Sequence, residues 1–260
     1  MCGIVGYIGG DQAAPILLSG LQKLEYRGYD SAGVAVYNDG GLRVVKSKGR
    51  LSVLEGILEG GVTLPGTVGI GHTRWATHGA PSDINSHPQV SDGGKFAVVH
   101  NGIIENYLYL KNHLIRRGVE FVSETDTEVV AQMLEHYYQG DVLEAIRKVI
   151  SKVEGSYALG IICADCPEKL YAVRKDSPLI IGVGEGENYI ASDVPAILSR
   201  TRDIYRLKDQ EIAVLTREGV SFYDQELEPI TKEIERVQWD VAAAEKGGYE
   251  HFMMKEICEQ

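Results

Sequence analysis

The stretch Cys2-Gly3-Ile4-Val5-Gly6-Tyr7-Ile8-Gly9-Gly10 predicts the first strand of the fold. The apolar residues from Gly3 to Ile8 suit a buried strand, and the glycine pair after them suits the turn that ends it. Asp11 is then placed to cap a helix. Apolar residues three or four apart over 16–24 form one face of that helix, which we expect to end near Gly28.

Beyond this opening, strand and helix patterns come in blocks. Short or alternating apolar runs predict strands at 32–37, 42–47, 67–71, 95–99, 157–163, 170–174, 179–183, 189–191, 211–216 and 220–223. Helical periodicity predicts helices at 105–117, 126–138 and 142–153. Because strands and helices do not alternate strictly, we expect an α+β fold with antiparallel sheets and separate helical layers, not a doubly wound parallel sheet.

Composition limits the classes of partner. Of 260 residues, 44% are hydrophobic, which is enough to fill a sizeable core of one large domain or two small ones. The 26 Lys and Arg residues are outnumbered by 37 Asp and Glu, so we expect neither a nucleic acid nor a membrane as a partner. No apolar run reaches the length of about 20 residues that a spanning helix needs, and no signal peptide is evident. A cytoplasmic location is therefore expected.

Cys2 is the first residue that suggests chemistry. The four cysteines are too few to staple a protein of this size, so reduced thiols are expected. If Met1 is removed, the new α-amino group has an ordinary pKa of about 7.7 to 8.0 and can act as a base beside the thiol. One residue would then supply both nucleophile and base. A cysteine after an initiator methionine is usually incidental, so other residues must support this interpretation.

Five segments, including the one that contains Cys2, supply that support. They are Cys2–Gly6, Tyr-Arg-Gly-Tyr-Asp-Ser-Ala-Gly at 26–33, His-Thr-Arg-Trp-Ala-Thr-His-Gly at 72–79, His-Asn-Gly at 100–102 and Glu-Thr-Asp-Thr-Glu at 124–128. Over essentially the whole chain, they resemble the class II glutamine amidotransferases of the Ntn-hydrolase fold. The resemblance implies a four-layer αββα sandwich, with two mostly antiparallel sheets flanked by helices, and a glutaminase domain over residues 1–240.

The segment from Glu25 to Gly33 narrows the resemblance within the family. It favours the members that pass ammonia to fructose 6-phosphate over amidophosphoribosyltransferase and asparagine synthetase. The stretch 249–257 resembles the linker of those members, which implies that residues 241–260 lead toward a C-terminal sugar isomerase domain that this sequence lacks. Fructose 6-phosphate would bind through that domain, and the full-length enzyme would be a homo-oligomer. Another amidotransferase of the same class, or a non-catalytic module that binds glutamine, remains an alternative.

The resemblance also assigns roles, which the chemistry of amide hydrolysis supports. A thioester mechanism on Cys2 needs an oxyanion hole, which the side-chain amide of Asn101 and the backbone N–H of Gly102 can supply. L-Glutamine carries a carboxylate that Arg74 can bind in a bidentate fork and an ammonium that Asp126 can bind. The plain alternatives are a hairpin turn at Asn-Gly, a solvated loop cation and a helix N-cap, respectively.

The remaining family positions would complete the site. Thr77, His78 and Gly102 would line the glutamine pocket with backbone or side-chain groups. Arg27 resembles the arginine near the catalytic amine, and Trp75 the loop aromatic that shields the site. Taken alone, Arg27 is an ordinary charge at a helix C-terminus and Trp75 an anchor of its loop.

Three other patterns are set aside. The histidines lack the i, i+4 spacing and interleaved thiolates of a metal site; they are His72, His78, His87 and His100. The pair Cys163 and Cys166 has no second pair to complete a zinc or redox site. The glycines of 182–186 have no helix behind them that could bind phosphate. We therefore expect no metal and no cofactor.

Overall fold

The computed structural model describes residues 2–238, which form two stacked antiparallel sheets. The eight-stranded sheet has the order β15-β11-β9-β10-β1-β4-β2-β3 and the seven-stranded sheet the order β14-β13-β12-β8-β7-β6-β5. Strands of the first are β1 (Gly3–Ile8), β2 (Ser31–Asn38), β3 (Gly41–Lys48), β4 (Val68–Arg74), β9 (Ile180–Gly184), β10 (Glu187–Ala191), β11 (Asp203–Arg206) and β15 (Glu235–Arg236). Strands of the second are β5 (Gln89–Val90), β6 (Phe96–Ile104), β7 (Gly155–Cys163), β8 (Leu170–Lys175), β12 (Ile212–Leu215), β13 (Val220–Tyr223) and β14 (Pro229–Ile230).

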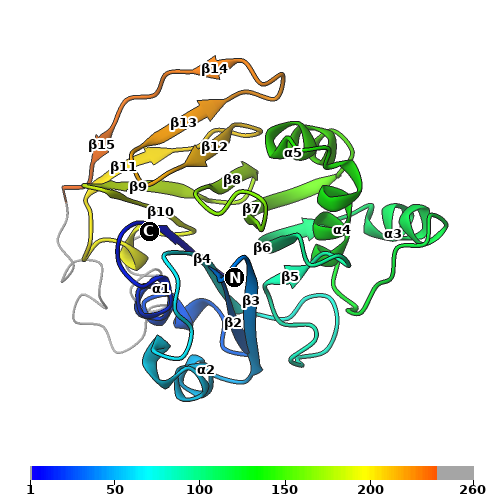
Figure 1. The fold of residues 1–260 in the computed structure, drawn as a ribbon, viewed down its shortest axis with the longest axis horizontal. Coiled ribbons are helices and arrows are strands. Elements are labelled where there is room, and N and C mark those ends of the chain that lie inside the picture. Colours follow the sequence, from blue (N-terminus) through cyan, green and yellow to red (C-terminus); the bar gives the residue numbers. More distant parts are fainter. Residues whose placement is uncertain (1, 239–260) are drawn as a thin grey trace, which may run out of the picture.

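Helices cover the outer face of each sheet (Figure 1). The helices α1 (Ala13–Gln22) and α2 (Leu51–Ile57) share a buried cluster with the eight-stranded sheet. The helices α3 (Tyr107–Ile115), α4 (Thr127–Tyr137) and α5 (Val142–Ile150) share another with the seven-stranded sheet. A third cluster fills the space between the sheets. The predicted α+β class and four-layer αββα sandwich are confirmed.

Strand β1 lies inside its sheet and is buried on both faces. It pairs with β10 on one side and β4 on the other, with Val5 opposite Ala191 and Gly71. Ile4 and Ile8 belong to the cluster between the sheets, whereas Val5 and Tyr7 pack toward α1. This double burial explains why the strand is apolar throughout instead of alternating.

The predicted elements are found with shifted ends, and one predicted cap is wrong. The cap residue of α1 is Gln12, and Asp11 instead forms a 2.8 Å ion pair with Arg200. The helix ends at Gln22, before the expected Gly28, and a 3-10 turn follows at Glu25–Arg27. Helix α2 and the strands β5, β11, β14 and β15 were not predicted. The predicted linker at 241–260 lies outside the described residues.

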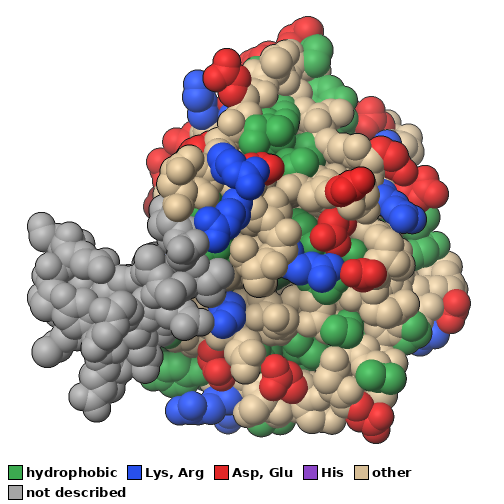
Figure 2. Space-filling model, turned by 90° about the vertical axis from the view of Figure 1, so that its left-hand side faces the viewer, with side chains coloured by type: hydrophobic (Ala, Val, Ile, Leu, Met, Phe, Trp, Pro, Cys, Tyr) green, Lys and Arg blue, Asp and Glu red, His purple; other side chains and the backbone are tan. Residues whose placement is uncertain are grey.

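Charged side chains of both signs are interspersed with hydrophobic ones on the face shown in Figure 2. Some of these charges form ion pairs: Arg206 of β11 contacts Glu235 of the edge strand β15 at 2.7 Å. Such exposed pairs contribute at most about 1 kcal/mol each. None of the helices in residues 2–238 is long and apolar enough to cross a membrane.

Three imidazoles are buried where β4 and β6 approach each other. The rings of His72 and His87 lie 4.3 Å apart between centroids, and those of His87 and His100 lie 6.5 Å apart. Burial lowers the pKa of His72 to about 3, and it lowers the pKa of His87 and His100 as well. All three are therefore neutral near pH 7, and each would have to be charged inside the protein at low pH.

We predict that this cluster makes the fold acid-labile. The unfolded chain binds protons on these histidines near pH 6.5, and the folded chain binds them only at lower pH, so the free energy of unfolding falls as pH drops below about 6.5. Urea unfolding at pH 7, 6 and 5 should show this slope, and His87→Gln should make it shallower. The variant His113→Gln, on α3, is the surface control. Equal slopes for wild type and His87→Gln would contradict the prediction.

Candidate functional site

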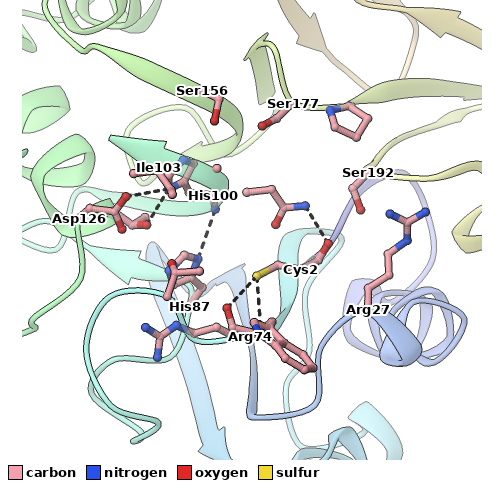
Figure 3. A pocket seen from close by; sticks show the side chains of 16 residues that line it. Cys2, Arg27, Arg74, His87, His100, Ile103, Asp126, Ser156, Ser177 and Ser192 are labelled. Carbon is pink, nitrogen blue, oxygen red and sulfur yellow. Dashed lines mark hydrogen bonds and ion pairs between the residues drawn. The ribbon is translucent and has the colours of Figure 1, made fainter. Parts of the chain in front are cut away.

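The predicted site residues gather around one cavity of about 320 Å³ next to the start of β1. Figure 3 shows Cys2 at its centre, Arg27 on one side, and His100 and Asp126 on the other. Eight of the predicted residues line it: Cys2, Arg27, Arg74, Trp75, Thr77, Asn101, Gly102 and Asp126. The ninth, His78, does not line the cavity with its side chain. Segments that are far apart in sequence thus form one pocket.

Cys2 is held at the cavity by two backbone-mediated contacts. Its Sγ accepts a hydrogen bond from the Trp75 N–H at 3.2 Å, and its carbonyl accepts one from Asn101 Nδ2 at 3.0 Å. Burial raises the pKa of the Cys2 thiol, against the opposing effect of the Trp75 N–H. The thiol therefore needs a base to become a thiolate near neutral pH.

Asn101 and Gly102 lie inside β6, so the hairpin alternative for Asn-Gly is wrong. They pair with Ala158 and Tyr157 of β7. Gly102 has a φ of +128°, and a Cβ at this position would lie 2.1 Å from the carbonyl oxygen of Ser156. Only glycine fits this backbone without strain. The glycine of Asn-Gly thus permits a positive φ within the strand and does not reverse the chain.

Arg74 and Asp126 place a cation and an anion in the same cavity, both almost fully buried. Arg74 ends β4, and its Nη2 donates to the carbonyls of His78 and Gly79. Its Nη1 is buried and has no hydrogen-bond partner among residues 2–238. Burial lowers the pKa of Arg74, although the neighbouring Cys2 and Asp126 oppose this. Arg74 is therefore not the solvated loop cation of the plain alternative.

The carboxylate of Asp126 is also engaged away from solvent. Asp126 precedes α4, but its side chain makes no capping hydrogen bond to that helix. Instead its Oδ2 accepts the Ile104 N–H of β6 at 2.8 Å. The side chain thus ties α4 to the strand that carries Asn101 and remains on the cavity wall.

The segment after β4 covers one side of the cavity. The side chain of Trp75 is about half exposed, and its ring meets Tyr29 edge-on at 5.7 Å. Thr77 lines the cavity. The ring of His78 packs edge-on against Tyr107 at 5.4 Å, and its backbone carbonyl accepts from Arg74. His78 therefore does not line the cavity, but its backbone carbonyl holds Arg74.

Arg27 lies on the opposite wall, in the 3-10 turn after α1. Its guanidinium pairs with Asp193, and its Nε donates to the hydroxyl of Tyr26 at 2.9 Å. Asp193 follows Ser192, which also lines the cavity and accepts the Ile4 N–H at 3.0 Å. Arg27 thus connects the turn to the end of β10, beside Cys2.

The rest of the segment 26–33 supports the backbone beyond β4. A Cβ on Gly28 would lie 2.7 Å from the carbonyl carbon of Arg74, so glycine permits this close approach. The Oδ2 of Asp30 accepts the Ala76 N–H at 2.9 Å. These contacts fix the peptide that presents the Trp75 N–H to Cys2, which gives the segment a physical role.

Sequence reasoning missed several cavity residues. His87, His100, Thr127 and Ser192 line the cavity, and the histidines had been considered only as metal ligands. The ring of His100 contacts Thr127 Oγ1 at 2.9 Å. The clustering of histidines near the matched segments was the available signal. Within the described part of the chain, no group of three or more His, Cys, Asp or Glu could hold a metal ion.

Comparisons with known proteins agree with this geometry. Residues 72–199 match the family described as the glutamine amidotransferase domain. All 260 residues align at 61% identity with the glutamine–fructose-6-phosphate aminotransferase (isomerizing) of Caldanaerobacter subterraneus subsp. tengcongensis, and equally with that of Clostridium acetobutylicum. The chain spans 43% of the length of each relative.

A solved structure extends the agreement to the fold. The glutamine phosphoribosylpyrophosphate amidotransferase from B. subtilis is 26% identical, with a TM-score of 0.75 over 88% of this chain and 50% of that chain. The resemblance predicted from the motifs is thereby confirmed. The chain belongs to the glutamine amidotransferases, in the class II branch with the Ntn-hydrolase fold.

Proposed function

We propose that the cavity binds L-glutamine and hydrolyses it to L-glutamate and ammonia. The observation that carries the proposal is the buried pair Arg74 and Asp126 in the same cavity as the Cys2 thiol. A free amino acid presents a carboxylate and an ammonium on one carbon, which such a pair complements. The buried and unpartnered Nη1 of Arg74 is a donor that the substrate carboxylate would satisfy.

The reaction would begin after Met1 is removed. The free amine of Cys2 takes the thiol proton, and the sulfur attacks the side-chain amide carbon of glutamine. The amine then returns the proton to the leaving nitrogen, the C–N bond breaks, and ammonia and a γ-glutamyl thioester form. Water, deprotonated by the same amine, attacks the thioester and releases glutamate and the thiol. The raised pKa of the buried thiol is the reason a base is required.

The negative charge of each tetrahedral intermediate would be stabilised by two donors. Asn101 Nδ2 already lies 3.0 Å from the Cys2 carbonyl, on the side of the cavity where the oxyanion would form. The N–H of Gly102 follows on the same strand. Such preorganised donors stabilise negative charge where it develops in the transition state.

The other predicted residues would shape and close the site. Arg27 would lie near the amine of the processed chain, with its orientation held by Asp193. Trp75 would orient the sulfur through its N–H and shield the site with its ring. Thr77 and the backbone of His78 would complete the glutamine pocket.

The relatives extend this proposal to the acceptor. Their name and their greater length support an enzyme that passes the ammonia to fructose 6-phosphate and makes glucosamine 6-phosphate. Residues 1–240 would then be the glutaminase domain, and 241–260 would lead to a sugar isomerase domain. We further propose that the full-length enzyme is a cytoplasmic homo-oligomer.

We predict that Cys2→Ala abolishes glutamate release from glutamine, because it removes the nucleophile. Mass spectrometry should first establish that the tested protein begins at Cys2, since a retained Met1 blocks the amine and should also abolish activity. Cys166→Ala is the matched control, because this partly exposed thiol lies outside the cavity. Glutamate release by Cys2→Ala, or none from correctly processed wild type, would refute the proposal.

We predict that Arg74→Gln and Asp126→Asn each raise the KM for glutamine by about tenfold to a hundredfold, since each removes a charge-assisted hydrogen bond. Steady-state kinetics of glutamate release would measure this. Arg116→Gln, an exposed cation at the end of α3, is the control and should leave KM unchanged. An unchanged KM in both cavity variants would show that the pair does not bind the amino acid.

A further inference from the structure

His72 is a buried side chain that the proposed mechanism does not yet use. It lies in β4, two residues before Arg74, and its side chain is fully buried. Its Nε2 is 3.0 Å from the carbonyl oxygen of His100 and 3.0 Å from Oδ1 of Asn101. Its Nδ1 is buried and has no hydrogen-bond partner among the described residues. The polar contacts of this ring are therefore confined to one nitrogen, and one of them reaches an oxyanion candidate.

The chemistry of the contacts fixes the proton on Nε2. Burial keeps the pKa of His72 far below its ordinary value of 6.5, so the ring is neutral and carries a single N–H. A backbone carbonyl can only accept, so the nitrogen facing the His100 carbonyl must be the donor. The N–H is therefore on Nε2, and Nδ1 is the bare nitrogen.

A donor at this place determines which way the Asn101 amide points. The amide has an accepting oxygen on one side and a donating nitrogen on the other. With an N–H of His72 against it, the oxygen must face His72, and Nδ2 must face the carbonyl of Cys2 at 3.0 Å. The reversed amide would set two donors against each other at His72 and two oxygens against each other at Cys2. Both contacts would then be repulsive.

We propose that His72 is a positioning residue, which holds the Asn101 amide with its N–H groups toward the oxyanion formed at Cys2. This inference rests on the proposed glutaminase reaction and adds a residue to its machinery. His72 does not touch the substrate; it acts through Asn101. Because an oxyanion donor works by being oriented before the charge appears, a freely rotating amide would lose part of its effect.

The surroundings of His72 suit this role. The ring packs against that of His87, with 4.3 Å between centroids and 32° between the ring planes. The second acceptor, the His100 carbonyl, belongs to the residue directly before Asn101. The Nε2–H of His72 thus donates to two neighbouring groups of β6. The ring cannot shift relative to the Asn101 amide without losing both contacts.

The test compares His72→Leu, His72→Gln and Asn101→Ala in the chain that begins at Cys2. His72→Leu removes the donor and fills its place with an apolar side chain, whereas the side-chain amide nitrogen of His72→Gln can take the place of Nε2. We expect His72→Leu to lower kcat by about tenfold or more, the effect of one lost oriented hydrogen bond. The KM for glutamine and inhibition by glutamate should stay within about twofold. His72→Gln should recover most of kcat.

The double variant His72→Leu, Asn101→Ala separates positioning from a general packing effect. If His72 acts only through Asn101, the double variant should have the kcat of Asn101→Ala alone. A further drop of the size seen in His72→Leu would overturn the proposal, because His72 would then act by another route. Thermal unfolding of each variant identifies those that fail to fold. If His72→Leu fails to fold, the kcat of His72→Gln, which retains the donor, is compared with the kcat of Asn101→Ala. His72→Gln should keep most of kcat, and Asn101→Ala should not.

The outcomes also keep the two proposals apart. No glutamate release from wild type, or release by Cys2→Ala, would refute the proposed function itself. Wild-type activity that drops strongly in Asn101→Ala but not in His72→Leu would leave the function standing and refute only the role of His72.

Discussion

The structure depends on the burial of β1 on both faces. This strand joins α1 to one side of its sheet and the second sheet to the other, so its apolar side chains belong to two cores at once. Its hydrogen bonds to β10 and β4 fix it along both edges. A shift of one residue would put a larger side chain at the place of Gly6, where a Cβ would lie 2.4 Å from the Ile190 side chain, so the strand is held in one register. Cys2, the residue before it, is therefore delivered to one place.

The site is built around that place by strands rather than by free loops. Arg74 ends β4, a direct neighbour of β1, and Asn101 and Gly102 belong to β6 of the other sheet. The sandwich thus brings the sulfur, the cation and the proposed oxyanion donors together from two packed layers. Burying Arg74 and Asp126 is costly, since each buried ion loses several kcal/mol of hydration. Hydrogen bonds to backbone groups offset part of that cost. The Nη1 of Arg74 has no partner in the described structure, so a ligand that accepts its hydrogen bond would offset more of it.

The sequence was most informative where one local rule decides the structure. The strand at Gly3–Ile8 was predicted with its observed ends because an apolar run between glycines has few alternatives. Asp11 was misassigned because its partner, Arg200, is almost two hundred residues away. Helix α2 (Leu51–Ile57) is short and contains Gly56, so it gives little helical periodicity. Distant pairing and short elements are the two reasons that the remaining parts could not be predicted.

The candidate site shows the same limits. Family motifs predicted nine site positions, and eight of them line one cavity. The motifs did not reveal that Asn101 and Gly102 continue a strand, because the positive φ of Gly102 and its close approach to the Ser156 carbonyl on β7 arise only in the folded sheet. Nor could spacing predict the clustering of three histidines, since it arises only when β4 and β6 pack together.

The histidine cluster connects stability with chemistry. A protonated His72 would keep its N–H on Nε2, so acid would not by itself reverse the Asn101 amide. The added proton would lie on Nδ1, which has no acceptor in the described structure, and the charge would be buried beside two other imidazoles. The cost of protonation therefore falls on the packing of β4 against β6 and not on the orientation of the amide. Low pH should thus weaken the packing of β4 against β6 before it changes the hydrogen bond that orients Asn101.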